Sequence, residues 1–159
     1  MQIPVRLKEI LEAMELQSDE LSAYLHRPTG RVIAVSDEAI ASAEEGPDGV
    51  AGVDELELAD ARGVLSGGAD YVQLPDRFEI DEYRMMEHFA AGVADPYARD
   101  ELLGALHGRG AFRRFKDSVR RHGLADEWYA YRDKSYEEVA RAWCEEHNVL
   151  LEPEPARDS

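Results

Sequence analysis

One short segment of the chain gathers a third of its basic side chains. Residues 108–123, GRGAFRRFKDSVRRHG, contain six of the 18 lysines and arginines and only one acidic residue. Guanidinium groups bind phosphate and carboxylate oxygens through paired, charge-assisted hydrogen bonds. The segment is therefore predicted to bind an anion through Arg109, Gly110, Arg113, Arg114, Lys116, Arg120 and Arg121.

Helical periodicity separates the apolar and basic side chains of this segment. At about 100° per residue, Phe112, Phe115 and Val119 fall on one side of a helix over 111–122, and the basic side chains fall mostly on the other. The preceding Gly-Arg-Gly turn permits close approach of a ligand to the backbone, and the first helical turn offers free N–H groups. This arrangement favours binding of a phosphate group or of a confined single strand of RNA.

A structural interpretation competes with the ligand site. Amphipathic helices usually expose a charged face to solvent. The chain has 34 acidic residues, so the arginines can pair with its own carboxylates, and each exposed pair contributes about 0–1 kcal/mol. The candidate partners on neighbouring elements are Asp81, Glu82, Glu87 and Glu127.

A second group with chemical potential is the acidic cluster at 79–87. Glu79, Asp81, Glu82 and Glu87 have the density of carboxylates that Mg²⁺ binding or general acid–base hydrolysis requires. The first three also stand near a predicted helix start, where the helix dipole favours negative charge. The cluster therefore indicates either a hydrolase site or the capping of a helix.

Histidine and cysteine form no strong metal or nucleophile pattern. The five histidines contain no HxxxH or HxH pair. Cys144 and His147 supply only two of the roughly four ligands that zinc needs, and Glu145 and Glu146 oppose formation of a Cys144 thiolate. No metal ligand, cofactor or catalytic residue is predicted.

Aromatic side chains follow the basic segment. Such rings can stack on nucleic-acid bases when basic residues lie among them. Their helical spacing favours the alternative, which is burial in the core. They are Trp128, Tyr129, Tyr131, Tyr136 and Trp143.

The N-terminal half is predicted to contain a small antiparallel sheet. Two β-compatible runs, 21–27 and 31–36, flank the turn sequence Pro28-Thr29-Gly30. A third run, 71–74, ends at Pro75, which has no N–H to continue a ladder. Helices are expected at three places: from Pro4, from Ser36 to Gly46, and over 54–66 with Leu56, Ala59 and Gly63 on the packed side.

The C-terminal half is predicted to be helical. Asp76 and Glu79 have the spacing of a capping box, and Ser135 and Glu138 have the same spacing. Asp95-Pro96 is typical of a helix start. The expected helices cover 77–92, 96–107, 111–122, a short stretch after Asp126, and 136–147.

Composition indicates a folded chain of the α+β class. Of its 159 residues 44% are apolar, enough to bury a core. The elements predict a small antiparallel three-stranded sheet covered by several helices, with a helix-rich C-terminal half. A single compact domain is predicted over 1–150, with a mobile loop at 46–52 and a disordered tail at 151–159.

The charge of the whole chain limits the partners that it can bind. A formal net charge of −16 argues against duplex DNA and against anionic membranes. No apolar run approaches the roughly 20 residues that cross a bilayer, and the start, MQIPVRLKEI, has no pattern of a signal peptide. The single cysteine favours the reducing cytoplasm.

Four motifs together resemble a known family. They are YVQLPD at 71–76, DEYRMMEHF at 81–89, GRGAFRRFKD at 108–117 and DEWYAY at 126–131. The chain resembles, over roughly 18–149, a bacterial family of small acidic proteins that is catalogued only as an uncharacterised protein family (UPF). The resemblance implies a bacterial cytoplasmic protein of α+β type and brings no activity, cofactor or catalytic residue.

Three functions are consistent with these patterns. The first is a non-enzymatic interaction or regulatory module, whose acidic surface contacts a protein partner and whose basic helix contacts an anionic one. The second is binding of phosphate or RNA through the basic helix 109–121. The third is a hydrolase that uses the acidic cluster 79–87, which is less favoured because no nucleophile, base and orienting group occur together.

Overall fold

The computed structural model describes residues 3–45 and 54–153. The predicted loop at 46–52 and the last residues of the predicted tail, 154–159, lie outside the described residues. The fold class is α+β, as predicted, with a three-stranded antiparallel sheet and many helices. No helix within the described ranges is long and apolar enough to cross a membrane.

The chain groups into two compact units. We call Met1–Glu79 with Val139–Ser159 the sheet unit, and Ile80–Glu138 the helical unit. The division falls within two helices, α4 (Arg77–Ile80) and α8 (Ala125–Glu146). Each unit is described separately below, and the single domain expected over 1–150 stays a prediction.

The sheet unit is built on the predicted hairpin. Strands β1 (Leu21–His26) and β2 (Arg31–Ser36) pair antiparallel, and β3 (Tyr71–Gln73) pairs antiparallel with the other edge of β1. The strand order is therefore β2-β1-β3. Gly30 closes the hairpin turn with a φ of 70°, a conformation that glycine adopts without strain.

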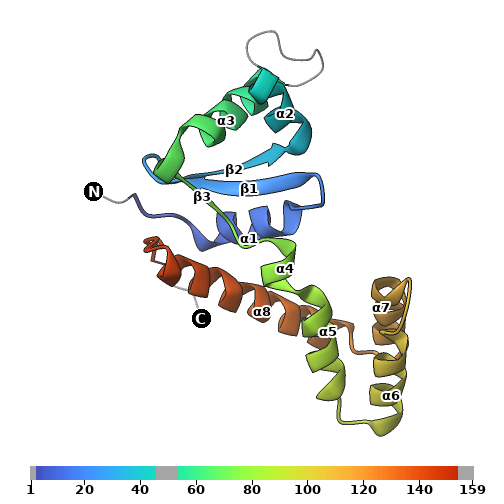
Figure 1. Cartoon of the computed structure of the whole chain (residues 1–159). Helices are drawn as coiled ribbons and strands as arrows, with labels where there is room; N and C mark the ends of the chain where they lie inside the picture. The colour runs from blue at the N-terminus through green and yellow to red at the C-terminus, as the bar shows by residue number, and fades with distance from the viewer. Residues whose placement is uncertain (1–2, 46–53, 154–159) are drawn as a thin grey trace. The chain divides into compact units, whose positions relative to one another are not determined.

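Helices cover both faces of this sheet (Figure 1). Tyr24 lies opposite Ile33 in the register, so both side chains point to the face that α2 (Asp37–Glu45) and α3 (Glu55–Ser66) cover. Helix α1 (Leu7–Leu16) packs on the opposite face. The buried core under α2 and α3 consists of Ile33, Val35, Ala39 and Ala61.

The start and the end of the described chain pair with each other in the sheet unit. Helix α1 begins at Leu7 and not at the predicted Pro4, because Val5 forms a parallel β-bridge with Leu151. The Val5 N–H donates to the Leu150 carbonyl, and the Glu152 N–H donates to the Val5 carbonyl, both at 2.8 Å. The disorder predicted for 151–159 therefore does not extend to residues 151 and 152.

The end of α8 is attached to the sheet by two long-range hydrogen bonds. Trp143 Nε1 donates to the Gln73 carbonyl on β3 at 2.9 Å, and an Arg27 guanidinium nitrogen donates to the His147 carbonyl at 2.7 Å. Trp143 is buried, as its helical spacing predicted. The C-terminal segment is therefore an integral part of the sheet unit.

Helix α3 packs with a different side from the predicted one. Leu56 is 76% exposed, whereas Ala61 is fully buried. Ala59 is exposed as well. The prediction was wrong for Leu56 and Ala59, because the side of α3 that faces α2 and β2 includes Ala61 and Val64. It holds for Gly63, which packs closely against the Tyr71 ring.

The helical unit contains α5 (Glu82–Ala91), α6 (Pro96–Ala105), α7 (Ala111–Arg121) and the first part of α8. Local capping explains two of the starts. Asp95 accepts a hydrogen bond from the Tyr97 N–H, and Pro96 occupies the first turn of α6. Asp81 accepts one from the Arg84 N–H at the start of α5.

Two predicted helix boundaries were wrong. The helix expected over 77–92 is broken into α4 and α5, because Asp81 adopts a left-handed conformation with φ 51°. The two helices expected after Asp126 form one continuous helix, α8. The Ser135 hydroxyl donates to the Tyr131 carbonyl one turn earlier in α8 and does not cap a new helix.

Aromatic rings fill the core of the helical unit. Trp128 is 1% exposed and lies edge-on to Phe89 and Phe115, with ring centroids 5.4 and 5.0 Å apart. Tyr131 lies 5.6 Å from the Phe89 ring. For Trp128 and Tyr136 the predicted burial is confirmed, whereas Tyr129 is 48% exposed.

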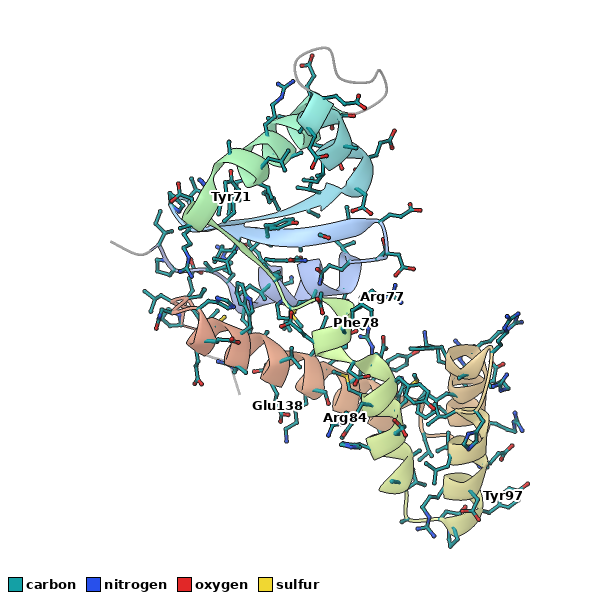
Figure 2. All side chains as sticks on the ribbon, in the orientation of Figure 1. Tyr71, Arg77, Phe78, Arg84, Tyr97 and Glu138 are labelled. Carbon is teal, nitrogen blue, oxygen red and sulfur yellow. The ribbon has the colours of Figure 1, made fainter. Side chains whose placement is uncertain are left out.

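The close packing of Tyr71 under α3 (Figure 2) makes a prediction about glycine. A Cβ at Gly67 would lie 2.5 Å from Tyr71 ring carbons and 2.6 Å from the Gly63 carbonyl oxygen. We expect Gly67→Ala to lower the free energy of unfolding by about 1–3 kcal/mol. Urea unfolding followed by circular dichroism measures this value.

The matched control is Gly104→Ala in α6. A Cβ at Gly104 meets no atom within 4 Å, and alanine is the better helix former by up to about 1 kcal/mol. We expect this variant to be as stable as the parent or more stable. Equal effects of the two substitutions would contradict the packing of Tyr71 described above.

Candidate functional site

The turn between α6 and α7 is shaped by glycine. Gly108 and Gly110 have φ of 78° and 76°, and Gly110 is the N-cap of α7 without a side-chain cap. Both conformations favour glycine. The Gly-Arg-Gly turn therefore lets the chain reverse within a few residues, so that α6 and α7 pack against each other.

The Arg114 side chain is exposed, but its guanidinium is bonded to the backbone of this turn. Its guanidinium donates to the carbonyl oxygens of Ala105, His107 and Arg109, with an Nε–oxygen distance of 3.2 Å to Ala105. These carbonyls include the end of α6 and lack partners within the helix. Arg114 is thus a cap for α6, supplied by the first turn of α7.

Arg121 is occupied at the other end of the same helix pair. It forms an ion pair with Glu101 on α6, and the His122 ring contacts the second oxygen of the same carboxylate. The structural interpretation of the arginines is therefore correct for Arg121, although its partner is Glu101 and not one of the carboxylates predicted from the sequence.

The other four predicted basic residues are exposed as well. They are Arg109, Arg113, Lys116 and Arg120. Within residues 3–45 and 54–153, the structure gives none of the four an ion pair or a side-chain hydrogen bond to an acidic residue. Of the predicted set, Arg114, Arg121 and Gly110 thus have structural roles.

Three of the exposed cations form a stripe along α7. Arg113, Lys116 and Arg120 stand at positions i, i+3 and i+7, on the side of the helix opposite to buried Phe115 and Ser118. We call these three residues the basic stripe. At 1.5 Å per residue it extends over roughly 10 Å.

An exposed aromatic ring lies beside the basic stripe. Phe112 was predicted on the packed side of α7, but it is 44% exposed. It stands four residues before Lys116, so the two side chains are neighbours on the helix surface. The prediction was wrong because Phe115, Ser118 and Val119 already fill the packed side.

Charge is distributed unevenly between the two units. Residues 80–138 contain 10 basic and 12 acidic residues, whereas the remainder of the chain contains 8 and 22. The excess of negative charge therefore belongs almost entirely to the sheet unit. The basic stripe lies in the near-neutral unit, where fewer carboxylates per cation oppose an anionic ligand.

The acidic cluster at 79–87 is largely used by the fold. Asp81 caps α5. Glu82 accepts a hydrogen bond from Arg132 Nε at 2.7 Å, and both side chains are mostly buried. Two of the four carboxylates that the hydrolase hypothesis needs therefore stabilise helix packing.

The contact between Glu82 and Arg132 extends to Tyr136. The Tyr136 hydroxyl lies 3.3 Å from Glu82 Oε2, and the Arg132 guanidinium lies 4.3 Å from the centre of the Tyr136 ring. This cluster was not among the sites predicted from the sequence. The only local signal was the i, i+4 spacing of Arg132 and Tyr136, which makes side chains neighbours on a helix.

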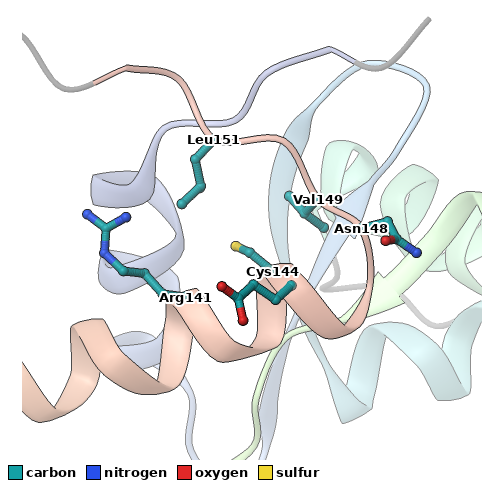
Figure 3. Close-up of a pocket in the computed structure, with 6 residues that line it drawn as sticks. Arg141, Cys144, Asn148, Val149 and Leu151 are labelled. Atoms are coloured by element: carbon teal, nitrogen blue, oxygen red, sulfur yellow. The ribbon is translucent and has the colours of Figure 1, made fainter.

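A shallow pocket of about 420 Å³ lies at the end of α8 in the sheet unit. Figure 3 shows Cys144 directed from α8 toward the segment that carries Val149 and Leu151. Asn148 adopts φ 56° after the helix, and the Val149 N–H donates to the Cys144 carbonyl at 2.8 Å. This helix ending folds the chain back over the thiol.

Burial suppresses ionisation of the Cys144 thiol. Desolvation raises its pKa from 9.0 to about 11, although the positive charge of Arg141 acts in the opposite direction. His147 stacks on Trp143 at 5.3 Å between ring centres. No group of three or more metal-binding side chains occurs in the described part of the chain.

The cap formed by Arg114 leads to a prediction on stability. Arg114→Ala removes three donors from the turn, and we expect the free energy of unfolding to fall by about 1–2 kcal/mol. Arg114→Lys does not restore it, because an ammonium lacks the planar fork. Arg113→Ala, one residue away on the exposed stripe, should change it by less than about 0.5 kcal/mol. Urea unfolding of the three variants tests this order.

The thiol leads to a prediction on pH. Between pH 9 and about 11 the unfolded chain loses the Cys144 proton while the folded chain retains it. The free energy of unfolding therefore falls as pH rises through this range. Cys144→Ser lacks this contribution, so its stability should fall less steeply with pH. Parallel pH profiles of the two proteins would contradict the buried, neutral thiol.

Comparison with known proteins identifies the family. No curated protein and no solved structure matches the chain. One family model does, that of an uncharacterised protein family, UPF0158, and the match extends over residues 2–154. The resemblance seen in the sequence motifs is thereby confirmed: the chain belongs to the uncharacterised protein family UPF0158.

Proposed function

We propose that the protein is a binding module without catalytic activity, which docks an anionic partner on the outer face of α7. The observation that carries the proposal is the basic stripe: three cations on one helix face, with no acidic partner among the described residues. In a chain with 34 acidic residues, neutralising partners for such cations are abundant. Arg121 pairs with such a carboxylate, and within the described residues the basic stripe does not. This difference supports a role for the stripe in binding a ligand and not in stabilising the fold.

The rigid setting of α7 supports the same proposal. Arg114 ties the N-terminal end of α7 to the end of α6, and Glu101 ties the C-terminal end through Arg121. Phe115, buried against Trp128, fixes the middle. A helix held at three points presents its outer side chains in a fixed arrangement, which lowers the entropy cost of binding.

The acidic charge of the sheet unit supports a second contact of this module, with a protein partner. It carries most of the negative charge of the chain and by itself repels polyanions. A basic protein is the partner whose charge complements this unit. The lone, buried Cys144 supports action in the reducing cytoplasm.

The proposal predicts binding of a polyanion that has no bases. The probe is inorganic polyphosphate, titrated calorimetrically at about 50 mM salt. We expect the triple variant Arg113→Ala, Lys116→Ala, Arg120→Ala to bind at least tenfold more weakly. The reason is the loss of three charge contacts, and the helix itself should remain folded because alanine favours helix.

The matched control removes the same charge elsewhere. Arg62, Arg84 and Lys134 are exposed on three other helices, and their triple replacement by alanine should leave polyphosphate binding close to that of the parent. Equal losses in the two triple variants would show that only total charge matters. That outcome, or no binding by the parent, would refute a docking face on α7.

A further inference from the structure

We infer that the partner of the α7 face is a single-stranded nucleic acid, whose phosphates contact the basic stripe and one of whose bases stacks on Phe112. The inference rests on the proposed function and adds the chemical class of the ligand. It is carried by the position of Phe112, an exposed ring beside a row of cations.

The exposed ring separates nucleic acid from other anions. Polyphosphate and acidic peptides satisfy cations but gain nothing specific from an aromatic face. A nucleotide carries both a phosphate and a flat base, and stacking of a base on an aromatic side chain is worth about 1–3 kcal/mol. Base stacking on Phe112 leaves Lys116, its neighbour on the helix surface, in reach of the phosphate.

The charge of the chain separates a single strand from a duplex. A duplex is stiff, with bases stacked inside it, so it offers no free base to Phe112. It would also extend past the roughly 10 Å of the stripe, and the net charge of −16 of the chain repels a stiff polyanion. A flexible single strand can contact the stripe with a few phosphates, while the rest of the strand extends into solvent away from the protein.

Asp117 allows a further test of the contact between Arg113 and a phosphate. It is the only acidic residue on α7, and it is exposed four residues after Arg113, at the edge of the stripe away from Phe112. Its carboxylate opposes a phosphate bound to Arg113. Replacing Asp117 by asparagine should therefore strengthen binding of a nucleic acid.

The test measures fluorescence anisotropy of labelled oligonucleotides with the full chain. The probes are an oligouridylate, the oligothymidylate of equal length and a duplex DNA, each of about a dozen nucleotides. Both single strands should bind more tightly than the duplex and more tightly than polyphosphate of equal charge. A preference between the two single strands identifies RNA or DNA as the source.

Variants then test the contacts. We expect Phe112→Ala to weaken single-strand binding about tenfold with polyphosphate binding unchanged, and Phe112→Trp to retain it. Phe78→Ala is the control, because Phe78, which Figure 2 labels on α4, is 92% exposed and precedes the stripe by several helices in the sequence. Removal of the stripe should reduce the slope of log K against log salt by about 2, and Asp117→Asn should tighten binding.

Each failure has its own meaning. If polyphosphate binds through the stripe but Phe112→Ala has no effect on single strands, the proposed function stands and the nucleic-acid inference is wrong. If single strands bind no more tightly than the duplex, the inference is wrong as well. If neither probe binds through the stripe, both proposals fail.

Discussion

The candidate site depends on one guanidinium group that is bonded to the backbone of a turn, although its side chain is exposed. Arg114 turns back on the turn before its own helix and holds the carbonyls of Ala105, His107 and Arg109. Without that cap, the end of α6 exposes carbonyl oxygens just where an anion would approach. With it, these negative dipole ends are covered by a cation. The neighbouring Arg113 can then face solvent, because the carbonyl oxygens of the turn already accept hydrogen bonds from Arg114.

The different roles of the arginines follow from their positions around the axis of α7. Arg114 and Arg121 lie at the border with α6, where carbonyls and Glu101 are within reach. The stripe lies beyond that border, and its members meet no carboxylate within the described residues. One basic run thus combines fold-supporting and ligand-facing positions, which a count of charges along the sequence does not separate.

Local chemistry was predictable and long-range contact was not. The hairpin followed from Pro28-Thr29-Gly30, and the start of α6 followed from Asp95-Pro96. The break at Asp81 did not, because a left-handed aspartate is unfavourable locally and persists through its surroundings. In the site, helical periodicity located the basic face, but the contacts of Arg114 bridge a turn whose geometry no pattern encodes. The exposure of Phe112 was not predictable either, because it depends on which side chains of α7 occupy the packed side.

The pairing of Val5 with Leu151 makes the sheet unit discontinuous in sequence. Trp143 and Leu151, which contact Gln73 and Val5, follow the whole helical unit along the chain. Contacts of such large sequence separation require the closure of a long loop and slow folding. The helical unit, which is one continuous stretch, is therefore expected to fold faster than the sheet unit.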